Sequence, residues 1–109
     1  MAEQVKTLVQ SAPLAATLTA LAAPGTGNSW AVSSIFVANR SATATSFRIS
    51  IAKAAAGDSV EQYIYYDIPI GGNDTFVATV GIGLEATDIF RVYATLATLS
   101  FTFEGVEIS

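Results

Sequence analysis

Ser46-Phe47-Arg48-Ile49-Ser50-Ile51 is the stretch that indicates the fold of this chain most clearly. Polar and apolar side chains alternate in it without interruption. Successive side chains of a β-strand point to opposite faces, so this period of two predicts a strand that is buried on one face only. Residues 99–104 alternate in the same way. Residues 63–70 do so too, and their pattern predicts a core-facing set, Ile64, Tyr66, Ile68 and Ile70, and an outward set, Tyr63, Tyr65 and Asp67.

Further strands are expected along most of the remaining chain. They cover 30–38, 76–84, 89–96, 5–10 and 17–22, although residues 20–23 would also suit a helix. Residues 30–38 are almost all apolar or small, which predicts a central strand buried on both faces. Seven to eight strands separated by Gly-, Asn- and Asp-rich turns predict an all-β fold, a single antiparallel β-sandwich of Ig-like or jelly-roll topology.

The first sixteen residues predict an extended N-terminal arm, followed by a sandwich domain over 17–109. Pro13 and the scattered apolar residues favour an extended segment over a compact hairpin. Such an arm would pair with its own sheet or add a strand to a neighbouring subunit. We therefore expect three of its apolar side chains to be interface residues: Val5, Leu8 and Leu14.

The composition argues against several classes of partner. Charged residues make up only 13% of the 109 residues, the net charge is −4, and the five basic residues are scattered. Proteins that bind nucleic acids need clustered cations, so we expect no nucleic-acid binding and no docking on an anionic membrane. A large uncharged surface suggests that other subunits cover part of it, the alternative being a soluble monomer coated with small residues.

Catalytic chemistry is not expected, because the chain contains no histidine and no cysteine. Histidine is the commonest general acid or base, and zinc sites depend on histidine and cysteine. The close carboxylate pairs, Asp58 with Glu61, Glu85 with Asp88 and Glu104 with Glu107, all lie beside expected turns, where such residues cap backbone donors or provide solubility. We expect no enzymatic activity, no metal site and no cofactor.

Two other features allow more than one interpretation. Gly81 and Gly83 share one face of an expected strand, which indicates a flat face or close approach by another backbone. Tyr63 and Tyr65 are expected on the face opposite the core, where tyrosines form protein interfaces. An ordinary amphipathic strand and a carbohydrate platform are the alternatives for these tyrosines.

Six segments carry a resemblance to a known group of proteins: 10–13, 32–40, 45–51, 63–67, 73–76 and 86–94. In this order, across most of the chain, they resemble small virion structural proteins of tailed bacteriophages. The resemblance implies a small β-sandwich on the particle surface, in capsid decoration or in the tail and neck. It also implies a virion location after assembly in the host cytoplasm, and it supplies no catalytic residues.

The resemblance further implies partners among other virion proteins, either the major capsid protein or tail and neck proteins. A part that is repeated by symmetry favours a homo-oligomer. The first functional hypothesis is therefore a capsid cement or decoration module that stabilises the assembled particle. The alternatives are a tail, neck or fibre-attachment component and, from another class, a carbohydrate- or receptor-binding module that uses the tyrosine face.

Overall fold

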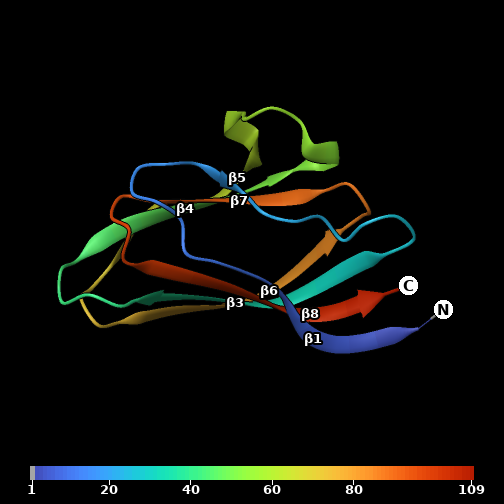
Figure 1. The fold of residues 1–109 in the computed structure, drawn as a ribbon, viewed down its shortest axis with the longest axis horizontal. Coiled ribbons are helices and arrows are strands. Elements are labelled where there is room, and N and C mark those ends of the chain that lie inside the picture. The colour runs from blue at the N-terminus through green and yellow to red at the C-terminus, as the bar shows by residue number, and fades with distance from the viewer. Residues whose placement is uncertain (1) are drawn as a thin grey trace.

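Two four-stranded antiparallel sheets packed face to face make up a computed structural model that describes residues 2–109 (Figure 1). The predicted β-sandwich is confirmed. The eight strands are β1 (Glu3–Ser11), β2 (Thr19–Ala20), β3 (Ser29–Asn39), β4 (Thr45–Ala52), β5 (Tyr63–Ile70), β6 (Thr75–Leu84), β7 (Ile89–Ala94) and β8 (Leu99–Ile108). Two short 3-10 turns, η1 (Lys53–Ala55) and η2 (Val60–Gln62), connect β4 to β5. None of the helical segments within residues 2–109 is long and apolar enough to cross a membrane.

The strand order selects the jelly roll from the two expected topologies. Sheet A has the order β1-β8-β3-β6, and sheet B has the order β2-β7-β4-β5. The first strand therefore pairs with the last, the second with the seventh, the third with the sixth and the fourth with the fifth. This is the pattern of a long hairpin rolled into two sheets.

The core lies between the sheets and draws its buried side chains from both, mainly from β3 and β8 of sheet A and from β4 and β7 of sheet B. Phe47, Phe101 and Phe103 are completely buried there, as the sequence alternation predicts. The ring of Phe47 makes an edge contact with that of Phe101 at a centroid distance of 5.9 Å, and Phe103 stacks on Phe90 of β7 at 4.2 Å. These rings join the two sheets because each pair draws one member from each sheet.

Strand β3 is central in sheet A, but the prediction that it is buried on both faces is wrong. Trp30 and Val32 are buried, and so are Ile35 and Val37, so the buried positions change from even to odd numbers along the strand. The pairing register shifts between Val32 and Ser34 against both neighbouring strands. A bulge of this kind adds one residue and reverses the facing of all later side chains. The apolar run therefore covers two half-strands of opposite parity, with one solvent-facing side.

A second irregularity corrects the predicted facing of β5. The register against β4 shifts twice, between the pairs Phe47↔Ile68 and Ile49↔Tyr65 and again before Ser50↔Tyr63. Asp67, at a φ of 52°, lies within the first shift. Ile68 and Ile70 face inward as predicted, whereas the predicted inward positions Ile64 and Tyr66 are 41% and 56% exposed. Tyr65, predicted to face outward, packs against the core instead.

The N-terminal segment pairs with its own sheet. Strand β1 runs antiparallel to β8 along the edge of sheet A, and the register shifts once between Thr7 and Val9. The backbones of Ala2 and Ser109 exchange two hydrogen bonds of 2.9 Å, which keeps the two ends of the described chain side by side (Figure 1). Of the expected strand over 17–22 only the two residues of β2 are extended in a sheet, and no helix forms there.

Candidate contact surface

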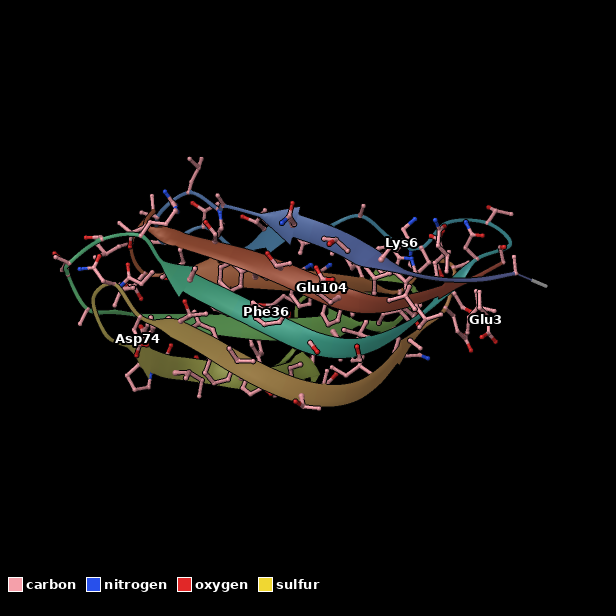
Figure 2. The ribbon with its side chains drawn as sticks, turned by 90° about the horizontal axis from the view of Figure 1, so that it is seen from below. Glu3, Lys6, Phe36, Asp74 and Glu104 are labelled. Carbon is pink, nitrogen blue, oxygen red and sulfur yellow. The ribbon has the colours of Figure 1, made fainter. Side chains whose placement is uncertain are left out.

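The outer face of sheet A carries an uncharged surface over β3 and β6. Neither strand contains a charged residue. We define the β3–β6 face by its exposed residues, which are Ala31, Ser33 and Phe36 on β3 and Thr75, Val77, Thr79, Gly81 and Gly83 on β6. Figure 2 views this side of the sandwich, with Phe36 in the middle of the sheet and the labelled charged residues on β1, β8 and the turn before β6.

Phe36 and Val77 form the apolar centre of the β3–β6 face. They are directly opposite each other in the antiparallel register, so their side chains are neighbours on the same side of the sheet. Phe36 is 36% exposed and Val77 is 57% exposed. Phe36 and Val77 were both missed as contact residues, and for Phe36 the reason is that the bulge in β3 is invisible in the sequence.

Two glycines flatten the other half of this face without any local need for glycine. Neither Gly81 nor Gly83 has a positive φ, and a Cβ placed on either would meet no atom within 4 Å. Gly105 in β8 is the opposite case, because its Cβ would lie 2.1 Å from the carbonyl oxygen of Ala31. A glycine inside a strand costs roughly 0.5–1 kcal/mol relative to alanine. Packing within the described residues explains Gly105 and does not explain Gly81 and Gly83.

The candidate interface residues of the N-terminal segment do not form one surface. Val5 is 84% exposed on the edge strand β1, whereas Leu8 is partly buried and packs against the core. Leu14 is 71% exposed in the connection between β1 and β2, close to the point where Ala16 N donates to Ala94 O at 2.8 Å. Their role in binding another subunit stays a prediction.

The two candidate tyrosines are also separated. Tyr65 makes an edge contact with Phe76 between the sheets, at a centroid distance of 5.3 Å. Tyr63 packs edge-on against Tyr66, at 5.2 Å, on the outer side of sheet B. Burial is the main cause that raises the pKa of Tyr63, and a hydrogen bond with Asp58 adds to it.

The exposed tyrosine of this cluster is covered by an arginine. The guanidinium carbon of Arg48 lies 4.2 Å from the ring centroid of Tyr66 and 4.7 Å from that of Tyr93. Arg48 Nε also donates to Asp67 Oδ1 at 2.6 Å, and this hydrogen bond is the main cause that raises the pKa of Arg48. A carbohydrate platform needs a free aromatic face, and the stacked guanidinium occupies one on each of these two tyrosines.

The carboxylate of Asp88 caps backbone donors, in accordance with the turn interpretation. Asp88 is buried, and its two oxygens accept hydrogen bonds from Ala54 N at 2.8 Å and Glu85 N at 2.9 Å. These bonds, with a smaller contribution from the charge of Lys53 at 3.6 Å, lower the pKa of Asp88. The group fastens the connection after β4 to the turn between β6 and β7.

A second carboxylate ties three strands of sheet A together. Glu107 of β8 accepts a hydrogen bond from Trp30 Nε1 of β3 at 3.0 Å and forms an ion pair with Lys6 of β1, also at 3.0 Å. The bond from Trp30, followed by that from Lys6, lowers the pKa of Glu107. Trp30 is thus a core side chain whose one polar atom is satisfied by a partly exposed carboxylate.

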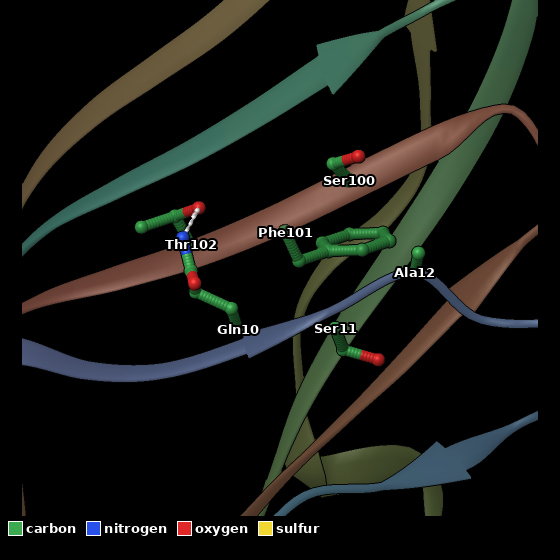
Figure 3. A pocket seen from close by; sticks show the side chains of 6 residues that line it. All are labelled: Gln10, Ser11, Ala12, Ser100, Phe101 and Thr102. Atoms are coloured by element: carbon green, nitrogen blue, oxygen red, sulfur yellow. Dashed lines mark hydrogen bonds between the residues drawn. The ribbon is translucent and has the colours of Figure 1, made fainter.

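A hollow lies where the end of β1 pairs with the beginning of β8 (Figure 3). Its lining consists of Gln10, Ser11, Ala12, Ser100, Phe101 and Thr102, and Gln10 Nε2 donates to Thr102 Oγ1 across it at 3.3 Å. The lining contains no titratable side chain. Among residues 2–109 there is also no group of three or more Asp or Glu side chains arranged to hold a metal ion.

No protein-family model matches this chain, and no curated protein sequence is significantly similar to it.

Proposed function

We propose that this chain is a structural subunit of a tailed-bacteriophage particle and serves as a capsid cement or decoration module. The observation that carries the proposal is the β3–β6 face, an uncharged sheet surface with the exposed apolar pair Phe36 and Val77 at its centre. Exposed apolar patches on otherwise polar surfaces mark sites of protein–protein contact. The jelly roll supports the proposal only by analogy, because this fold is common among viral structural domains and also occurs in lectins.

The stabilising mechanism would be binding that favours the assembled particle over its free subunits. A module that contacts two neighbouring capsid subunits binds only where both are in place. Binding of this kind stabilises the assembled state by about 2.7 kcal/mol per site when the free module is present at a hundred times its dissociation constant. Shape and burial of apolar surface are sufficient for such a role, and no reaction is required.

The copy number of the protein in purified particles tests this proposal against its nearest alternative. A cement or decoration module is present in a number that follows the capsid lattice, whereas a tail, neck or fibre-attachment component is present in a small symmetric number. Quantitative gel densitometry against the major capsid protein separates the two. A copy number that matches the tail or neck would reject the capsid role and leave the virion role standing.

A pair of surface variants tests the contact face itself. We expect Phe36→Glu to lower the occupancy of the protein on particles, because it places a charge at the centre of the β3–β6 face. Val60→Glu is the matched control, since Val60 is 89% exposed on η2, away from sheet A. Equal occupancy of the two variants would show that this face makes no contact with the particle. Complete absence of the protein from purified virions would reject the function as a whole.

The carbohydrate-binding alternative depended on an open tyrosine face, and the geometry gives it little support. Tyr65 packs between the sheets, and Arg48 lies over Tyr66. A glycan array provides a direct check. Binding of any glycan that is lost in Tyr66→Ala and kept in Phe36→Glu would favour this alternative.

A further inference from the structure

The four edge strands of the sandwich differ in how well they are protected against pairing with another chain. Strand β2 has only two residues, and β5 contains Pro69 and two register shifts. Strand β1 has the charged residues Glu3 and Lys6 and one register shift. Short length, proline, charge and bulges are the features by which proteins block edge-to-edge pairing.

Strand β6 lacks most of this protection. It is ten residues long, contains neither a charged residue nor proline, and has β3 as its one neighbour in sheet A. Residues 75–79 of β6 pair with β3 in unbroken register. Five residues of regular strand therefore have a free edge, followed by the register shift between Thr79 and Ile82.

The hydrogen-bond register shows which backbone groups of β6 face this free edge. Asn39 N donates to Asp74 O at 2.9 Å, one step before the first pair of the β3–β6 ladder. Antiparallel pairs alternate between those that exchange both backbone bonds and those that exchange none. The groups of Phe76 and Ala78 are thus directed to β3, whereas those of Thr75, Val77 and Thr79 are directed outward. In agreement, Thr75 N donates to the side chain of Asp74 at 2.8 Å.

We propose that β6 is the strand through which two copies of this chain pair, antiparallel about a twofold axis at Val77. Val77 lies midway between the other two outward-directed residues, Thr75 and Thr79. On the axis, Val77 therefore pairs with Val77 of the second copy, and Thr75 of each copy pairs with Thr79 of the other. Sheet A of one copy then continues into sheet A of the other as one eight-stranded sheet. A twofold contact of this kind needs a self-complementary surface, and this register provides it.

A second copy fits this edge better than a charged partner does. Each copy has a net charge of −4, which opposes association at long range, and an uncharged contact adds no local repulsion to it. In the proposed register Asp74 opposes Val80, and no charged residue opposes another. The exposed Val77 side chains of both copies meet on the outer face, each beside its own Phe36. This inference concerns the free protein and does not depend on the virion role.

Charge variants at the axis give a test that is specific for this register. We expect sedimentation equilibrium over a concentration series to show that the wild-type chain dimerises. The variants Val77→Lys and Val77→Glu should each remain monomeric, because like charges would face each other across the axis. A mixture of the two variants should dimerise again. The matched control is Val5→Lys, which changes an exposed valine on the other edge of sheet A and should keep the wild-type dimer.

Amide hydrogen exchange supplies a readout at the level of single residues. In the wild-type dimer the amides of Val77 and Thr79 should be protected, and in Val77→Lys that of Thr79 should exchange freely. The amides of Phe76 and Ala78 should be protected in both proteins, which shows that the variant remains folded. The proposal is overturned if the wild-type chain stays monomeric, if the mixture of charge variants does not dimerise, or if Val5→Lys abolishes the dimer.

Discussion

Gly105→Ala should destabilise this protein more than any other exchange of glycine for alanine within its strands. Gly105 is buried where β8 passes the bulge of β3, and an added Cβ would lie 2.1 Å from Ala31 O and 2.9 Å from Val32 Cα. Both atoms belong to the backbone of the neighbouring strand, so no side chain can rotate away to make room. The two central strands of sheet A would have to separate by about 1 Å or more to restore ordinary contact distances.

The expected size of the effect follows from the cost of overpacking. Forcing one extra methyl group into a close-packed interior costs typically 1–3 kcal/mol, and a backbone clash belongs at the upper end, about 3 kcal/mol. For a domain of this length, about 4 °C of melting temperature corresponds to each kcal/mol. We therefore expect Gly105→Ala to melt about 12 °C below the wild type, measured by circular dichroism or by calorimetry.

Gly83→Ala is the matched control for this prediction. Gly83 is also a strand residue of sheet A, but nothing lies within 4 Å of its added Cβ. Removing a strand-interior glycine should stabilise the fold by roughly 0.5–1 kcal/mol, which raises the melting temperature by about 2–4 °C. If Gly105→Ala melts at or above the wild-type temperature, the close approach of β3 and β8 is incorrect. If Gly83→Ala melts far below it, the outer face of β6 is not open.

Two further predictions concern single side chains. Two backbone hydrogen bonds lower the folded-state pKa of Asp88, so its contribution to stability should be complete above the unfolded pKa of about 3.8 and should disappear as the pH falls through the lower folded pKa. In urea titrations at a series of pH values, Asp88→Asn should therefore lose less stability than the wild type in this acidic range. Identical pH profiles of the two proteins would contradict the role of this carboxylate. Tyr65→Ser should lower the free energy of unfolding by about 2 kcal/mol or more, because it removes a ring that packs on Phe76. Tyr66→Ser, on the exposed side of β5, should change the free energy of unfolding by less than about 1 kcal/mol. Equal losses of the two variants in chemical denaturation would contradict the assigned facing of β5.

The alternation of β4 and β8 predicted the facing of their large apolar side chains correctly. However, β8 continues to Ile108 through the turn expected beside Glu104 and Glu107, and Ser50, expected on the outer side of β4, is completely buried. In β4 and β8 the buried residues Phe47, Ile49, Phe101 and Phe103 are those that the period of two selects. Alternation is a local property of a strand with one buried face, so it is visible without knowledge of the partner strands. The Gly- and Asn-rich turn before β6 was visible for the same reason.

Errors occurred where a strand changes register. In β3 the change of parity between Val32 and Ile35 looked like a strand buried on both faces. In β5 the residue Asp67 at positive φ reversed the facing of Tyr65 and Tyr66. A bulge inserts one residue relative to a neighbouring strand, so only the pairing of the two strands defines it.

By itself, the sequence determined that this chain forms an all-β sandwich with an uncharged surface, because alternation, turn residues and charge content are properties of short segments. The tertiary structure alone decided the jelly-roll order, the exposure of Phe36 beside Val77, and the position of β6 at an open edge. Which strand is an edge depends on which strands pair, and these pairings join residues far apart in the chain. For that reason the candidate contact surface appears only when the strands are assembled.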